Sequence, residues 1–354
     1  MPVIDPMNLP MPSNPCLLPD GASGSRSEVC GCSVEHRTST RKPALSAKGK
    51  RGIAFHLFLV WLLVAGGRTM CMAADADPKA PQAPAGLRIG FFGYWSGETA
   101  AVVKAAGGAN DRFVPAAMGS ASALPFMKVG GAAAVGKRAA QSLEQGEVDA
   151  LVICLWSSYP GRWEGHVGEQ STLSQLADLG KKNNPEFRIL WHAFMMPSLD
   201  KPRTQGGKYV FNLPKTKEGL GNDRRQLEAE VDGVNKRHGR RVACIIPFAD
   251  AALTLMDQIA AGKFPGLTDP GALFPDDDSW SPGRQLLALS AYCHYATLCG
   301  KSPVGLKVPF GEFQYASKGK PSRSLGALTD EEDAILQRIA WETVSKYPYA
   351  GIAK

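Results

Sequence analysis

The sequence lacks the features that mark several common classes of protein. After residue 76 it contains no internal repeat and no low-complexity tract. The formal net charge is only +7 over 354 residues, and the excess of lysine and arginine is spread along the chain. Nucleic-acid-binding proteins gather such charges on one face. We therefore expect no nucleic-acid partner.

Recognisable metal motifs are also missing after residue 76, where neither His-Glu-x-x-His nor Cys-x-x-Cys occurs. We therefore predict no metal and no cofactor. Four of the eight cysteines lie in this part: Cys154, Cys244, Cys293 and Cys299. An even number permits disulfides in an exported protein, but Cys154 and Cys244 lie in apolar, strand-like runs that suit buried free thiols equally well. Cys293 and Cys299 face different sides of one expected helix, which argues against a bond between them.

A targeting segment precedes the folded part of the chain. The basic residues of 48–51 lead into the apolar run 53–64 and then into small residues, which is the order of a secretory signal. Arg68 ends this run before it reaches the roughly 20 apolar residues of a membrane span. We place cleavage between Ala73 and Ala76, and expect a periplasmic or extracellular protein without a stable membrane span. An uncleaved signal anchor is the lesser alternative.

The remaining chain divides simply. We assign residues 1–76 to the leader and signal peptide, residues 77–85 to a linker, and residues 86–354 to one α/β domain. Four expected strands alternate with helices, which predicts parallel βαβ units in a three-layer, flavodoxin-like sheet of four or five strands with helices on both faces. The expected strands are 87–93, 148–155, 187–192 and 241–247, and the helices between or after them are 98–106, 132–145, 172–182, 217–237 and 249–261.

Two more helices are expected near the end, over residues 284–298 and 329–346. Thr329 followed by Glu332 is typical of a capping box. Residues 206–221 interrupt the alternation with glycine and proline, so we expect a loop over the active edge of the sheet.

Candidate site residues follow from the fold class, because ligands of open parallel sheets bind outside the carboxyl ends of the strands. The segments expected at this edge supply Gly93, Tyr94, Trp95 and Ser96 after the first strand, Trp156 after the second, His192 at the end of the next, and Asp277 and Trp280 before the late helix. His166 lies on a loop that should border the same cleft. Four of these residues are large aromatics, which suit a ligand that offers apolar faces.

Three stretches carry a resemblance to the SGNH hydrolases, the GDSL-type esterases: the turn at 93–96, residues 179–191, and residues 291–305. The last two look like an exported bacterial group of these proteins, and the resemblance covers roughly residues 86–310. It implies an ester hydrolase whose activated serine lies after the first strand, with oxyanion donors on further loops and an Asp-x-x-His pair before the final helix. On this resemblance Ser96 is the nucleophile and Asp277 belongs to the pair.

The chain departs from the family pattern at each of these points. Tyr94 and Trp95 replace the single aspartate between glycine and serine, and the loop near Trp156 has no asparagine. The pair that should end in histidine ends in Trp280, which cannot accept a proton. His294 is about three turns into the late helix and so is expected away from the sheet edge.

A displaced base would therefore come from His166 or His192. Each candidate also has a structural explanation. Ser96 can act as a helix N-cap, the run 276–278 as a solvated loop, His166 as an exposed loop residue, and His192 as a hydrogen-bonded core histidine.

Two functions follow from the sequence. One is an exported esterase acting on carbohydrate or lipid esters with a nonstandard Ser/His/Asp site. The alternative is a noncatalytic protein of the same fold whose aromatic rim binds a glycan or another small molecule. The missing histidine favours the second, and the serine at the sheet edge favours the first.

Overall fold

A computed structural model describes one folded unit within residues Ala73–Lys354. The described residues are 86–93, 95–108, 110–119, 133–154, 168–193, 212–274, 282–312, 314–315, 323–324 and 326–352. The leader, the linker and five candidate site residues lie outside them, namely Tyr94, Trp156, His166, Asp277 and Trp280.

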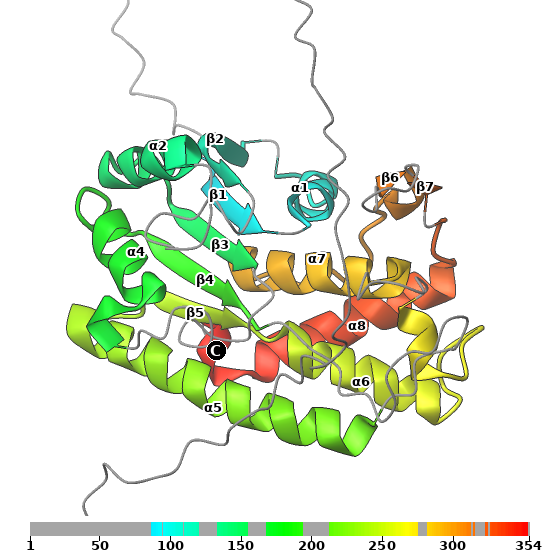
Figure 1. Ribbon diagram of the computed structural model, residues 1–354. Coiled ribbons are helices and arrows are strands. Elements are labelled where there is room, and N and C mark those ends of the chain that lie inside the picture. Colours follow the sequence, from blue (N-terminus) through cyan, green and yellow to red (C-terminus); the bar gives the residue numbers. More distant parts are fainter. Residues whose placement is uncertain are drawn as a thin grey trace, which may run out of the picture. The chain divides into compact units, whose positions relative to one another are not determined.

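The centre of the unit is a five-stranded sheet in the order β2-β1-β3-β4-β5, in which all neighbouring strands are parallel (Figure 1). The strands are β1 (Arg88–Gly93), β2 (Arg112–Gly119), β3 (Ala150–Cys154), β4 (Arg188–His192) and β5 (Ala243–Ile246). This order is the flavodoxin-like one, with the change in winding direction between β1 and β3. The predicted fold class is confirmed.

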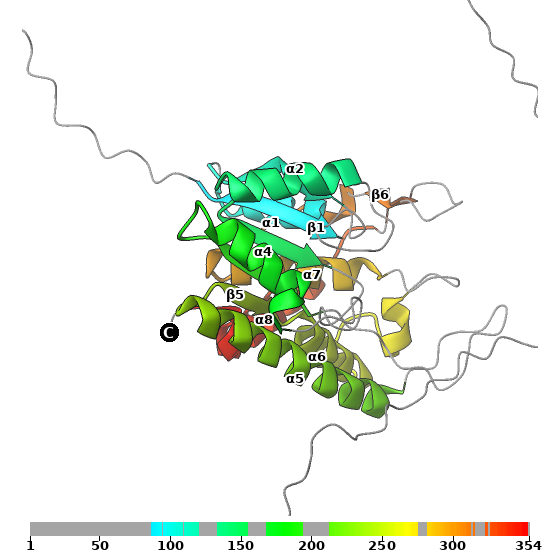
Figure 2. The same ribbon diagram turned by 60° about the vertical axis from the view of Figure 1, so that its left-hand side comes forward.

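Helices cover both faces of this sheet (Figures 1 and 2). One face carries α2 (Ala133–Glu144), α4 (Thr172–Lys181) and α5 (Leu213–His238), and the other carries α1 (Ser96–Ala105), α7 (Arg284–Cys299) and α8 (Asp330–Lys346), with α6 (Phe248–Ala260) packed on α7 and α8. Short elements complete the described part: β6 (Gln314–Tyr315), β7 (Arg323–Ser324) and 3-10 turns at Gly168–Gln170, Pro270–Leu273, Phe310–Glu312 and Pro348–Ala350.

Helix α7 is unusual because it has almost no solvent-facing side. Every residue from Gln285 to Leu298 is buried, as expected of a helix that is apolar all round. It lies between α1, α8 and the strands β4 and β5. None of the described helices combines the length and apolarity needed to cross a membrane.

Several local predictions can be compared with the structure. The capping box at Thr329 and Glu332 is present in both directions, and all four cysteines of the described part are free. Residues 206–221 are not all loop, because α5 begins at Leu213, where the side chain of Asn212 accepts from the backbone N–H of Lys215. Strand β2 was not predicted; it contains Pro115 and lies at the edge of the sheet, where a missing N–H is tolerated.

Candidate functional site

The turn between β1 and α1 has a strained backbone. Gly93 has φ 119°, and a Cβ atom there would lie 1.7 Å from the carbonyl oxygen of Cys154. Only glycine therefore fits this close approach of β1 to β3. Trp95 has φ 72° and is the one non-glycine residue with positive φ in the described part of the chain. Such a conformation in a bulky residue costs about 1–3 kcal/mol and is found most often at functional sites.

Ser96 is the first residue of α1 and is partly exposed at the carboxyl edge of the sheet. The N-cap is Trp95, and no side-chain hydrogen bond caps the helix. The interpretation of Ser96 as an N-cap is therefore wrong. Among the described residues, the hydrogen bonds of the two nearby imidazoles, His192 and His294, go to each other and to Thr99 rather than to Ser96.

A hydrogen-bonded chain lies beneath this turn and joins three elements. His192, the last residue of β4, places its Nδ1 2.8 Å from Nε2 of His294 on α7. His294 Nδ1 lies 2.7 Å from the hydroxyl of Thr99 on α1. That hydroxyl donates in turn to the carbonyl oxygen of Trp95 at 2.9 Å. The side chains of His192, His294 and Thr99 are all fully buried.

The direction of these bonds determines which nitrogen of each imidazole carries a proton. Because Thr99 uses its only hydrogen on Trp95, its oxygen must accept from His294 Nδ1–H. His294 Nε2 then accepts from His192 Nδ1–H. His192 Nε2 is consequently an acceptor nitrogen, which is the state required of a general base.

Both imidazoles are neutral at physiological pH. Burial lowers the pKa of His294 to about 3. Burial, with a smaller contribution from His294, also lowers the pKa of His192 well below its ordinary value. A neutral imidazole is the form that accepts a proton or binds a metal ion.

Aromatic rings form the walls around this pair. The ring of Phe248 stacks on His192 at a centroid distance of 4.7 Å, and the Trp95 indole meets His192 edge-on at 5.3 Å. Phe91 contacts His294 at 5.4 Å. The turn after β1 therefore covers His192, and the imidazole pair lies in an apolar environment.

A third chemically active side chain joins the pair. Cys154, the last residue of β3, is fully buried. Its Sγ and one nitrogen from each of His192 and His294 all lie within 4.8 Å of one another. The three residues form the one cluster of possible metal ligands found in the described part of the chain. The sequence motifs alone predict no metal site here.

The structure brings together four of the predicted site residues: Gly93, Trp95, Ser96 and His192 all lie at the carboxyl edge of β1 and β4. His294 was expected away from this edge, which is wrong, because α7 lies along α1 and places His294 beside His192, the last residue of β4. Thr99 and Cys154 were also not among the candidates. A signal for His294 existed, since it is the one histidine within a helix that is otherwise almost wholly apolar.

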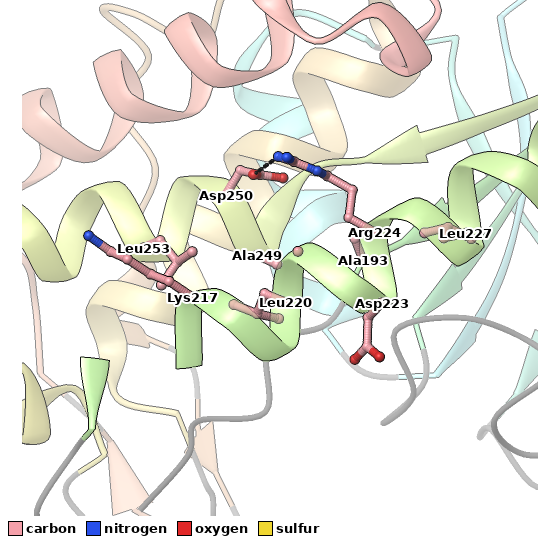
Figure 3. A pocket seen from close by; sticks show the side chains of 10 residues that line it. Ala193, Lys217, Leu220, Asp223, Arg224, Leu227, Ala249, Asp250 and Leu253 are labelled. Atoms are coloured by element: carbon pink, nitrogen blue, oxygen red, sulfur yellow. Dashed lines mark hydrogen bonds and ion pairs between the residues drawn. The ribbon is translucent and has the colours of Figure 1, made fainter. Parts of the chain in front are cut away.

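A cavity of about 170 Å³ begins at Ala193, one residue after His192, and lies between α5 and α6 (Figure 3). Arg224 and Asp250 form an ion pair of 2.6 Å at its wall, facing apolar residues such as Leu220 and Leu253. Burial raises the pKa of the Asp250 carboxyl despite its partner. Sites for drug-sized ligands measure roughly 300–1,000 Å³, so this cavity suits only a small group.

Comparisons with known proteins add little to this geometry. No family model matches the chain, and no curated protein matches it. Among solved structures, the chain is similar to a DUF4886 family protein from Bacteroides uniformis, with 9% sequence identity and a TM-score of 0.42. The match covers 74% of this chain and 95% of the other.

Proposed function

We propose that this is an exported hydrolase of carbohydrate or lipid esters, with Ser96 as the nucleophile and His192 as the general base. The observation that supports it best is the strained turn of Gly93 and Trp95, which leaves Ser96 partly exposed at the start of α1 and places the Trp95 ring on His192. A nucleophile on a sharp strand-to-helix turn is a recurring arrangement in serine hydrolases. The resemblance of the sequence to SGNH hydrolases agrees with this position.

In the proposed reaction the Ser96 oxygen attacks the ester carbonyl carbon while its proton passes to His192 Nε2. The carbonyl oxygen becomes an oxyanion near the backbone N–H groups at the start of α1, whose dipole favours negative charge. Collapse of this intermediate expels the alcohol, which takes the proton from His192. Water then releases the acid from Ser96 by the same steps. Because Trp95 covers His192, the indole must move aside when substrate binds.

His294 takes the place in this scheme that a carboxylate has in a standard triad. It fixes the tautomer of His192 by accepting its Nδ1–H. A neutral imidazole stabilises the imidazolium formed during the reaction less than a carboxylate does. We therefore expect slow turnover.

The test is hydrolysis of p-nitrophenyl acetate, p-nitrophenyl butyrate and acetylated xylan by the purified protein. Ser96→Ala should lower the rate at least about 100-fold, since an activated hydroxyl is lost. Ser302→Ala, an exposed serine on the loop after α7, is the matched control and should keep full activity. If Ser96→Ala hydrolyses all three esters as fast as the control variant, the proposal fails.

A noncatalytic glycan-binding protein is the second candidate, and the complete burial of His192 favours it. In that case the imidazole pair is a core feature, and the partly exposed Trp95 stacks on a sugar face. Trp95→Ala should then abolish binding of xylo-oligosaccharides in calorimetry, whereas Trp341→Ala, a partly exposed tryptophan on α8, should not. Equal binding by both variants would exclude this candidate.

A further inference from the structure

Cys154, His192 and His294 come from three separate elements and meet inside the protein. They belong to the end of β3, the end of β4 and the middle of α7, and each is 0% exposed. Their sulfur and nitrogen atoms lie within 4.8 Å of one another. No short sequence motif identifies these three residues as a site, because 102 residues separate the two histidines.

We propose that these three side chains bind one soft metal ion, and that this ion is Cu⁺. Thiolate and imidazole are the ligands that copper and zinc take in proteins, whereas magnesium and calcium take oxygen ligands. The inference goes beyond ester hydrolysis and does not depend on it.

The spacing of the two imidazole nitrogens fits a metal ion after a small adjustment. Two imidazole nitrogens at about 2.0 Å from one metal lie roughly 3.3–3.5 Å apart in tetrahedral or trigonal geometry. His192 Nδ1 and His294 Nε2 are 2.8 Å apart, with a shared proton between them. A metal ion that takes the place of this proton moves the two rings apart by about half an ångström, which is within ordinary side-chain freedom.

The surroundings of His294 resemble the outer shell of a metal site. Metal-binding histidines almost always donate their second ring N–H to an oxygen, which holds the ring in place. His294 Nδ1 lies 2.7 Å from the Thr99 hydroxyl, which is itself bonded to the Trp95 carbonyl oxygen. His294 Nε2 is therefore directed towards the cluster without any metal being needed to place it.

Charge decides between copper and zinc. A thiolate with Cu⁺ is neutral, whereas the same thiolate with Zn²⁺ leaves a net positive charge, and burying an uncompensated charge is costly. The walls around the two imidazoles are the rings of Phe91, Phe248 and Trp95. The apolar walls therefore favour Cu⁺.

Binding has a defined proton balance. The Cys154 thiol loses one proton to solvent when its sulfur bonds to Cu⁺. His192 changes tautomer: its proton leaves Nδ1, which becomes a ligand, and Nε2 becomes protonated. Each ion bound therefore releases one proton in total, and His192 Nε2 changes from acceptor to donor.

The test is a Cu⁺ titration of the full chain under reducing conditions, in competition with bicinchoninate as a coloured Cu⁺ chelator. The four cysteines before Ala73 are replaced by serine in every variant, so that they cannot contribute. We expect one Cu⁺ per chain. Cys154→Ser and His294→Gln should each lower the affinity at least about 100-fold, since one of three ligands is lost.

Cys244→Ser is the matched control, because Cys244 is a buried free cysteine on β5, which is separated from β3 by β4 in the same sheet. It should bind Cu⁺ like the unsubstituted protein, and circular dichroism should show that all variants are folded. The proposal is overturned if the unsubstituted chain takes up no more Cu⁺ than Cys154→Ser, or if Zn²⁺ displaces Cu⁺ at equal concentration. Because no substrate is present, failure of this test leaves the esterase proposal standing, and the reverse is also true.

Discussion

Two buried polar networks share helix α7, and they are built differently. On one side of the helix, Tyr292 donates to Asp333 of α8 at 2.5 Å, and the amide nitrogen of Gln337 lies 3.1 Å from the tyrosine oxygen and 2.9 Å from Asp333. The same amide group also bonds to the backbone of Gly305 and Leu306 beyond the end of α7. Two residues further along the helix, His294 belongs to a sparser chain, with one bond to Thr99 and one to His192.

The two networks differ in the number of hydrogen bonds that each side chain makes and in the chemical nature of the atoms that they bring together. Gln337 connects a side chain on α7, a side chain on α8 and two loop residues, so this network holds two helices and a loop together. Networks with every member satisfied make a core rigid. The histidine chain contributes fewer bonds, but it collects nitrogen and sulfur atoms that can accept protons or bind metal. We infer that the Tyr292 network is structural and that the His294 chain is functional.

The largest expected effect on stability tests the structural side of this comparison. Asp333→Ala leaves the buried Tyr292 hydroxyl without its charged acceptor and removes one of the three acceptors of the Gln337 amide, which should lower the free energy of unfolding by about 3 kcal/mol. Urea unfolding measures this. Asp330→Ala is the control, since Asp330 lies on the same helix but pairs with Lys307 at the surface, and should show no measurable change.

Copper affinity of the folded Asp333→Ala protein should equal that of the unsubstituted chain. A fall in affinity comparable to that of His294→Gln would mean that the two networks are not separate, and the division of α7 into two roles would be wrong.

A smaller loss of stability, with a clear effect on binding, is expected for Thr99→Val. Valine keeps the shape of threonine but leaves the buried His294 Nδ1–H without an acceptor, which costs about 2 kcal/mol. Cu⁺ affinity should fall about 10–100-fold, as for other outer-shell partners of metal ligands. Thr254→Val is the control, because its hydroxyl makes the same type of bond to a backbone oxygen four residues earlier, on the exposed side of α6. Equal losses in the two variants would rule out an orienting role for Thr99.

The smallest effect concerns pH. The pKa values of His192 and His294 are lowered in the folded state. Between the folded pKa and about 6.5, the unfolded chain therefore binds more protons than the folded chain. In this range the free energy of unfolding must decrease as the pH is lowered. Each imidazole adds about 1.4 kcal/mol per pH unit to the slope below pH 6.5. His294→Gln should therefore flatten the decline in unfolding free energy between pH 7.5 and 5.5. An unchanged slope would show that protonation of the pair is not linked to unfolding.

The sequence predicted the sheet well because apolar strands and amphipathic helices leave local patterns. It missed β2 (Arg112–Gly119), in which Ala117 is the one buried residue and which includes a proline. It predicted Gly93, Trp95, Ser96 and His192 from the rule that sites of parallel sheets lie at the carboxyl ends of strands.

Long-range packing explains the rest. Thr99 and His294 are 195 residues apart, and nothing local in either helix shows that their side chains meet. Cys154 looked like an ordinary core thiol because burial alone does not reveal its neighbours. The backbone strain at Trp95 was equally invisible, since neither composition nor hydrophobic period reports the sign of φ.

The burial of α7 on all sides also has a consequence for the order of folding. During synthesis, the five strands and α7 are complete before α8 has been made. Until α8 arrives, Tyr292 and much of the apolar surface of α7 have no cover, and a half-made chain would expose a hydrophobic helix of 16 residues to its neighbours. Such surfaces aggregate. Packing of α8 on α7 therefore completes the fold. Truncation within α8 should yield insoluble protein even though all five strands of the central sheet are present.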